Sequence, residues 1–99
     1  MTDNKIKDIY EYSNPDKVKE NIKKYFGKNL SLYLSYKPDK KYMLQSPDGK
    51  WVHFGAINYK DYTLHQDENR RQRFLKRNAK WSKAEKYSPA YLSYYLLWN

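Results

Sequence analysis

The hydrophobic pattern of the chain changes its period at about residue 30. Before that point, apolar side chains recur at helical spacing, at Val18, Ile22, Tyr25 and Phe26. Asn14 followed by Pro15 is typical of a helix start, and Gly27 is typical of a helix end. The sequence therefore predicts a helix over about residues 15–26.

After this helix, apolar and polar residues alternate, which is typical of a half-buried strand. The apolar positions of the alternation are Leu30, Leu32, Leu34 and Tyr36. Residues 37–40 interrupt it with a proline, and it resumes from Tyr42 to Gln45. A Pro-Asp-Gly turn signature at 47–49 then precedes a last run from Trp51 to Ala56. The pattern predicts a three-stranded antiparallel meander with a tight hairpin at Asp48-Gly49.

A basic helix is predicted next. Thr63 with Gln66 three residues later fits a capping box, which indicates a helix over about residues 64–80. One arc of this helix is apolar, with Leu64, Phe74, Leu75 and Trp81. The other arc is cationic, with Arg70, Arg73, Lys76, Arg77 and Lys80. Arg71 and Asn78 fall within the apolar arc, and a guanidinium there needs a carboxylate partner, Asp61 or Asp67.

Ser88 and Pro89 predict the start of a short last helix. Its side chains from Tyr91 to Trp98 are too apolar to face water. We expect this helix to dock on the sheet or on another copy of the chain, in which case residues 91–98 would form a homo-oligomer contact.

Together these elements predict an α+β fold. It consists of an N-terminal helix, a three-stranded antiparallel meander, a basic helix and a short apolar C-terminal helix. The chain of 99 residues has the size of one domain. Residues 1–13 are polar with isolated apolar side chains, which predicts an N-terminal arm followed by a single small domain over residues 14–99.

The composition excludes several classes of site. The chain has no cysteine, so it can form neither a disulfide framework nor a Cys-based zinc site. Its three glycines are isolated, and no Ser/His/Asp motif stands in a recognisable context. We therefore expect no catalytic residue, no cofactor and no metal, and a protein that is not an enzyme. No apolar run approaches the roughly 20 residues of a membrane span, and the N-terminus is too polar for a secretory signal, so we expect a protein that is not secreted.

The charge of the chain is strongly positive and its arginines are clustered. The formal net charge is +9, and all four arginines lie between Arg70 and Arg77. Between Asn69 and Lys86, eight basic residues accompany one acid. Guanidinium groups bind phosphate or carboxylate in a bidentate fork, so this cluster indicates a polyanionic partner. The 12 tyrosines offer flat faces with polar tips, which suit base stacking as well as cores.

A basic helix beside a β-hairpin predicts binding of nucleic acid through phosphates, largely independent of sequence. The predicted contacts are Arg70, Arg73, Lys76, Arg77, Lys80, Lys40, Lys41, Lys50 and Trp51. The alternative is a solvated helix face whose charges serve solubility alone.

A second constellation consists of His53, Asp61, His65 and Asp67. It would support a metal-dependent nuclease if the two histidines and a carboxylate converged. However, His65 and Asp67 are two residues apart, which places them on different sides of a helix. The better-motivated interpretation is structural: Asp67 offsets the helix dipole, and His65 caps or packs. The residues expected to hold the fold are His53, Phe54, Asp61, Asp67 and Trp98.

The motifs also resemble those of a known group. They run Lys41-Tyr42-Met43, His53-Phe54-Gly55, Asp61-Tyr62-Thr63-Leu64-His65-Gln66-Asp67, an arginine-rich helix and a terminal Leu97-Trp98. Over about residues 41–98 the chain resembles small basic proteins of uncharacterised function encoded by giant and other large nucleocytoplasmic DNA viruses. Asn78 departs from their pattern, in which a histidine often follows the arginine that matches Arg77.

The resemblance implies a viral protein that acts in the infected host cell, in the cytoplasm or virus factory, or in the virion. It transfers no catalytic residue. Large DNA viruses need basic proteins that neutralise packaged DNA, which favours DNA over RNA as the partner. The alternative is a virion structural protein, a minor capsid or core component. Such a protein would bridge acidic virion proteins through tyrosine-rich surfaces and the C-terminal helix.

Overall fold

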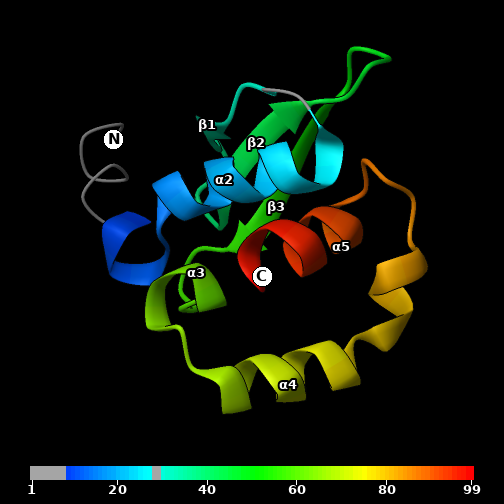
Figure 1. Ribbon diagram of the computed structural model, residues 1–99. Coiled ribbons are helices and arrows are strands. Elements are labelled where there is room, and N and C mark those ends of the chain that lie inside the picture. The colour runs from blue at the N-terminus through cyan, green and yellow to red at the C-terminus, as the bar shows by residue number, and fades with distance from the viewer. Residues whose placement is uncertain (1–8, 28–29) are drawn as a thin grey trace.

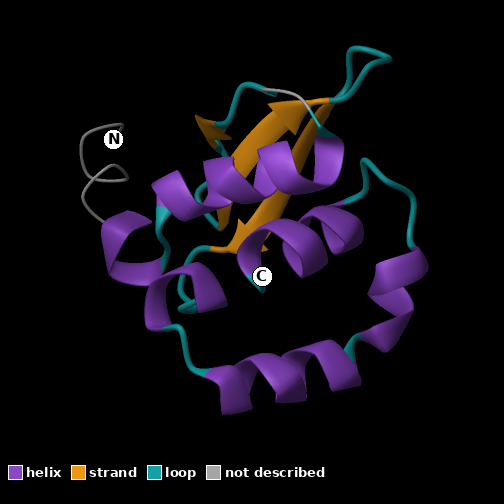
Figure 2. Cartoon of the chain, in the orientation of Figure 1, coloured by secondary structure: helices purple, strands orange, loops and turns teal. Residues whose placement is uncertain are grey.

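The computed structural model describes residues 9–27 and 30–99, which form an α+β domain (Figure 1). The elements in chain order are α2 (Pro15–Phe26), β1 (Tyr33–Leu34), β2 (Lys40–Gln45), β3 (Trp51–Ala56), α3 (Tyr62–His65), α4 (Glu68–Arg77), the 3-10 helix η1 (Ala79–Lys83), α5 (Pro89–Leu92) and the π-helix η2 (Ser93–Leu97). The strands form one antiparallel sheet in the order β1-β2-β3 (Figure 2). The predicted fold class and meander are confirmed. Across these described ranges, no helix has the length and apolar character that crossing a membrane requires.

The core lies between one face of the sheet and the helices α2, α5 and η2, which lie across that face (Figure 1). Its buried apolar side chains from these elements are Tyr42, Leu44, Phe54, Val18, Ile22, Phe26, Leu92, Leu96 and Leu97. Removal of this apolar surface from water is the main favourable term in folding. The helix α2 begins and ends where the sequence predicts: the side chain of Asn14 caps it, and Gly27 follows it in the left-handed conformation.

The strand β1 is much shorter than the alternation predicts. It pairs with β2 at Tyr33↔Met43 and Leu34↔Tyr42. Beyond Leu34 the predicted faces are reversed, because Ser35 is 2% exposed and Tyr36 is 71% exposed. The N–H of Ser35 donates to the Lys41 carbonyl over 3.1 Å, and its hydroxyl lies 2.7 Å from Nδ1 of His53. The polar side chain is therefore satisfied inside, and the prediction that Tyr36 faces the core is wrong.

The single helix predicted over residues 64–80 is also wrong, since the segment is divided into α3, α4 and η1. Gln66 adopts a left-handed conformation with φ 53°, and its N–H donates to the Tyr62 carbonyl over 3.0 Å. Asp67 then caps α4, where its Oδ1 accepts the N–H of Arg70 over 3.2 Å. The capping residue of the basic helix is thus Asp67, whereas the side chain of Thr63 is buried.

The first residues that the structure describes belong to the domain. Residues 9–12 are helical, and Ile9 is 1% exposed. The carbonyl of Tyr12 accepts the N–H of Asp61 over 3.0 Å, and Ser13 is fully buried. The domain therefore begins no later than Ile9, and residues 1–8 of the predicted arm lie outside the described residues.

The C-terminal segment docks on its own chain. Ser88 caps α5 as predicted, and the buried apolar side chains of the segment are Leu92, Leu96 and Leu97. Asn21 of α2 holds it in place, because its Nδ2 donates to the carbonyls of Leu96 and Asn99 over 3.0 and 3.1 Å. Of the two docking places expected for residues 91–98, the segment occupies the one on the domain itself.

Gly55 of β3 is a position where added volume is expected to be costly. Its φ is 84°, and a Cβ atom there would lie 2.8 Å from Cδ1 of Leu97. We predict that Gly55→Ala lowers the free energy of unfolding by about 2–4 kcal/mol, through backbone strain and overpacking together. The control is Gly49→Ala, because Gly49 has a φ of 88° but the nearest atom to its Cβ would be 4.0 Å away. This control should lose about 1–2 kcal/mol. Urea unfolding measures both losses, and equal values would contradict the packing argument.

Candidate functional site

A buried ion pair joins the start of β2 to the loop before α3. The Nζ of Lys41 lies 3.1 Å from Oδ2 of Asp61, and the two side chains are 2% and 1% exposed. The ammonium also donates to the carbonyl of Tyr59. Buried charges persist when they are paired and their remaining hydrogen-bonding capacity is used. Both conditions are met here.

Hydroxyl groups extend this pair into a buried chain of hydrogen bonds. The Oγ1 of Thr63 donates to Asp61 and lies 3.2 Å from Oγ of Ser13. Ser13 in turn accepts a hydrogen bond of 2.7 Å from the Tyr42 hydroxyl. Because each hydroxyl carries one proton, Ser13 donates to Thr63, and every proton of the chain points toward the carboxylate. Burial raises the pKa of Tyr42, so its phenol remains a donor.

Lys41 is not the phosphate contact that the sequence predicts. Its side chain is buried, and its ammonium is bound to Asp61 and to a backbone carbonyl. Burial lowers the pKa of Lys41, and the neighbouring Asp61 opposes that shift. The prediction for Lys41 is therefore corrected: the residue holds the fold, together with Asp61, for which the sequence does predict that role.

The helix α4 stands apart from the sheet in Figure 1, and none of its ten residues, all of them described, is buried. Phe74 stacks on Trp98 with ring centroids 4.1 Å apart and planes at 4°. Arg71 donates from Nε to the Trp98 carbonyl over 2.9 Å and from Nη2 to Oδ1 of Asn99 over 3.1 Å. An aromatic stack and an arginine thus fasten α4 to the end of the chain.

Arg71 is structural, as predicted, but its carboxylate partner differs from the prediction. Its Nη1 lies 2.9 Å from Oε1 of Glu68, one turn earlier on α4, rather than beside Asp61 or Asp67. Hydrogen bonds from Gln72 and Arg71 lower the pKa of Glu68. Arg71 is therefore occupied by its contacts and is not available to a partner molecule.

A cleft of about 800 Å³ lies between α4 and the rest of the domain. The charged residues that line it are Lys40, Lys41, Lys60, Arg70, Arg73, Arg77 and Asp61. Asp61 is already paired with Lys41, and among the described residues Lys60, Arg70, Arg73 and Arg77 take part in no ion pair. Aromatic rings also line the cleft, from Phe54, Tyr59, Phe74, Trp81 and Trp98. The cleft thus combines an excess of cationic side chains with flat apolar surfaces.

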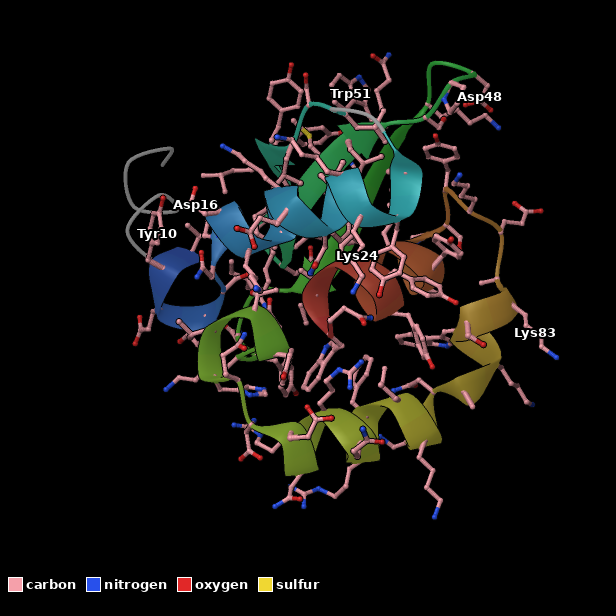
Figure 3. The ribbon with its side chains drawn as sticks, in the orientation of Figure 1. Tyr10, Asp16, Lys24, Asp48, Trp51 and Lys83 are labelled. Carbon is pink, nitrogen blue, oxygen red and sulfur yellow. The ribbon has the colours of Figure 1, made fainter. Side chains whose placement is uncertain are left out.

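Besides the buried Lys41, four of the predicted phosphate contacts line this cleft: Arg70, Arg73, Arg77 and Lys40. The three arginines follow a spacing of three and four residues, which places them on one face of α4. Lys76 and Lys80 are exposed but do not belong to the lining. Trp51 lies at the hairpin end of the sheet, at the opposite end of the molecule from α4 (Figures 1 and 3), and Lys50 directly precedes it in the chain. The predicted continuous footprint of helix and hairpin is therefore divided.

Sequence reasoning missed two kinds of cleft residue. Lys60 and Tyr59 are exposed and lie in the short loop between β3 and α3. Their one sequence signal is proximity to Asp61. Trp81 and Trp98 are recognisable in the sequence as apolar positions. That they line the same cleft as the arginines depends on the contact between α4 and the end of the chain, which the sequence does not reveal.

The histidines and acids considered for a metal site are dispersed. The Nδ1 of His53 is hydrogen-bonded to Ser35 beneath the sheet edge. The Nδ1 of His65 instead accepts the N–H of Asp67 over 2.9 Å, and its ring packs on Trp98 with centroids 5.3 Å apart. Burial lowers the pKa of His65. In the described ranges no three such side chains gather as a metal ion would require, which leaves the nuclease hypothesis without a site there.

The buried pair gives a prediction about stability. Lys41→Met leaves the Asp61 carboxylate buried without its cation, so we predict a loss of about 3–5 kcal/mol in the free energy of unfolding. Lys60→Met is the matched control, because Lys60 lines the same cleft but is exposed, and its loss should stay within about 0.5 kcal/mol. Chemical unfolding compares the two variants. Similar losses would contradict the prediction that the buried Lys41–Asp61 pair contributes more to stability than an exposed lysine does.

Comparison with known proteins places part of the chain in a wider group. Residues 30–78 match the sequence model of a family of unknown function (DUF5754). The matched segment contains the sheet, α3 and α4, and it leaves out α2 and the C-terminal helices. No curated protein and no solved structure matches the chain. The chain is thus similar, over the segment that carries the cleft arginines and Lys60, to a family whose description states no activity.

Proposed function

We propose that this protein binds nucleic acid without enzymatic action, through phosphate contacts in the cleft beside α4. The observation that carries the proposal is the lining of the cleft. Three arginines of α4 face a shared space with Lys40 and Lys60 from the sheet and its following loop. The charge density of this lining suits a polymer of phosphates better than a single carboxylate.

The availability of the arginines supports the proposal. In the described residues, ion pairs form at Lys17–Glu20, Lys41–Asp61 and Arg71–Glu68. Arg70, Arg73 and Arg77 take part in none of these pairs. They can therefore bind phosphate without first giving up a carboxylate, in contrast to Arg71 on the same helix.

The same chemistry favours binding that is largely independent of sequence. Contacts from arginine and lysine to phosphate position a protein on nucleic acid but carry no sequence information. The resemblance to basic proteins of large DNA viruses favours DNA as the polymer, in an infected cell or a virion.

A structural role in a virion is the second candidate, favoured by exposed rings on the sheet. Tyr33 and Trp51 are 49% and 44% exposed and meet edge to face with centroids 5.6 Å apart. Tyr36 is 71% exposed. Aromatic residues are enriched at protein interfaces. These rings, rather than residues 91–98, would bridge neighbouring subunits.

Charge reversal on α4 tests the leading proposal. We predict that Arg73→Glu/Arg77→Glu weakens binding to a short random-sequence DNA at least tenfold, because two attractive contacts become repulsive. The melting temperature should change little, since neither side chain is buried or paired in the described structure. Fluorescence anisotropy measures the affinity.

The control for this variant is Lys19→Glu/Lys23→Glu on α2. Both positions are exposed and four residues apart, like the α4 pair, and the net charge falls by the same amount. The control should retain most of the affinity. If both variants lose affinity equally, net charge rather than the cleft governs binding, and the proposed site is wrong.

The salt dependence of binding gives an independent prediction. With the five cations of the cleft in contact with phosphate, log affinity should fall with log salt at a slope of about −3 to −5. Arg73→Glu/Arg77→Glu should reduce the magnitude of that slope by about 2. If no DNA or RNA binds even at low salt, the nucleic-acid proposal fails and the structural role becomes the leading one.

A further inference from the structure

The geometry of the cleft points to unpaired nucleotides, not duplex, as its ligand; this inference rests on the proposed function and specifies its ligand. We infer that a single strand lies along α4, with its phosphates on Arg70, Arg73 and Arg77 and its bases against the aromatic lining. The sequence alone suggests a cationic helix turned toward solvent, which would suit either form of nucleic acid. In the structure Arg70, Arg73 and Arg77 stay exposed but line a cleft shared with the rest of the domain, and this placement carries the inference.

The first argument is the shape of the site. A helix that reads or clamps duplex enters a groove or lies against the backbone as a convex surface. Here Arg70, Arg73 and Arg77 belong to one wall of a cleft whose opposite wall carries Lys40 and Lys60. A ligand that touches both walls must enter a space of about 800 Å³. A strand of a few nucleotides fits such a space, whereas a duplex is far wider than one strand.

The second argument is the aromatic content of the cleft. Stacked base pairs hide their flat faces from the protein, so rings in a cleft can stack only on bases that are unpaired. Phe74 and Trp98 already occupy one face of each other in a parallel stack. Trp81 meets Phe74 edge to face at 5.8 Å and 78°. Within the described residues no ring stacks in parallel on Trp81 or on the exposed Tyr59, so these two rings of the cleft are placed to receive a base.

The third argument is the length of the cationic face. Arg70 and Arg77 are seven residues apart on α4, which corresponds to about 10 Å along the helix axis. Two or three consecutive nucleotides cover roughly that length. Lys40 and Lys60 would then contact the strand from the other side. The site therefore holds a short stretch of a longer strand and reads charge and ring faces, not base identity.

The test compares two forms of nucleic acid on the unaltered protein. The probes are an oligothymidylate of about 12 nucleotides and a random-sequence duplex of the same length, at one salt concentration. We expect the single strand to bind at least tenfold more tightly, although the duplex carries twice as many phosphates. Equal affinities, or tighter binding of the duplex, would overturn the inference while leaving the proposed function intact. No binding of either probe would overturn both.

A pair of tryptophan variants tests the stacking contact. Trp81→Leu keeps an apolar side chain but removes the flat ring, so it should weaken oligothymidylate binding about tenfold. Trp51→Leu is the matched control outside the cleft and should change affinity by less than about twofold. Inorganic polyphosphate, which has charges but no bases, should compete equally well for both variants. If Trp81→Leu weakens polyphosphate and oligothymidylate alike, the loss reflects the fold and the stacking contact is refuted.

Tryptophan fluorescence gives a second test that does not require the Trp81 variant to fold, because Trp81 is retained. In the Trp51→Leu protein the two remaining tryptophans, Trp81 and Trp98, both line the cleft. Stacking of bases should quench their fluorescence as oligothymidylate is added, and polyphosphate should not. Quenching by neither probe, with the strand shown to bind, would place the bases outside the cleft and overturn the inference.

Discussion

The buried carboxylate of Asp61 is the point on which the rest of the structure depends. It receives the ammonium of Lys41 and the hydroxyl of Thr63, and through Thr63 it orders the hydroxyls of Ser13 and Tyr42. Because a buried charge left without these partners costs several kcal/mol, the segments that supply them must assemble together. The network therefore fixes the residues before α2, the strand β2 and the loop before α3 relative to one another. The same loop carries Tyr59 and Lys60, which line the cleft.

The helix α4, in contrast, is attached to the domain although none of its residues, all of them described, is buried. It is fastened by Phe74 and Arg71 to the last residues of the chain. Local stability follows buried apolar contact, so a helix fastened in this way is expected to open at lower free energy than the sheet. The same arrangement leaves Arg70, Arg73 and Arg77 exposed, whereas Arg71 is held by its contacts. The molecule thus joins a core held by the buried Asp61 network to a cationic helix with no buried residue among those described.

Local signals predicted those parts of the fold that local forces decide. The caps of α2 at Asn14 and Gly27 and the turn at Asp48-Gly49 act within a few residues, and each was predictable. The failures lie where distant groups decide. Ser35 is buried because His53 and the backbone of Lys41 satisfy it, and no pattern around Ser35 contains either partner.

The candidate site, too, combines features that local sequence predicts with features that depend on distant contacts. Clustered arginines were visible in the sequence, and three of them do meet in one cleft. Lys40 and Lys41 look alike in the sequence, yet Lys40 is partly exposed beside the arginines and Lys41 is buried and paired with Asp61. The two are successive residues of β2, whose side chains point to opposite faces, and Lys41 lies close to Gly55.

The covering of the sheet has a consequence for how this architecture is inherited. The segment that is similar to the family model, residues 30–78, contributes Tyr42, Leu44 and Phe54 to the core, but their packing partners on α2 and in the C-terminal segment lie outside it. The unit of sequence similarity is therefore smaller than the unit of folding. A protein with only this segment would need other flanking sequence, or a second polypeptide, to cover the apolar face of the sheet. If the segments on either side were exchanged, the surroundings of the cleft would change while the cleft arginines stayed in place.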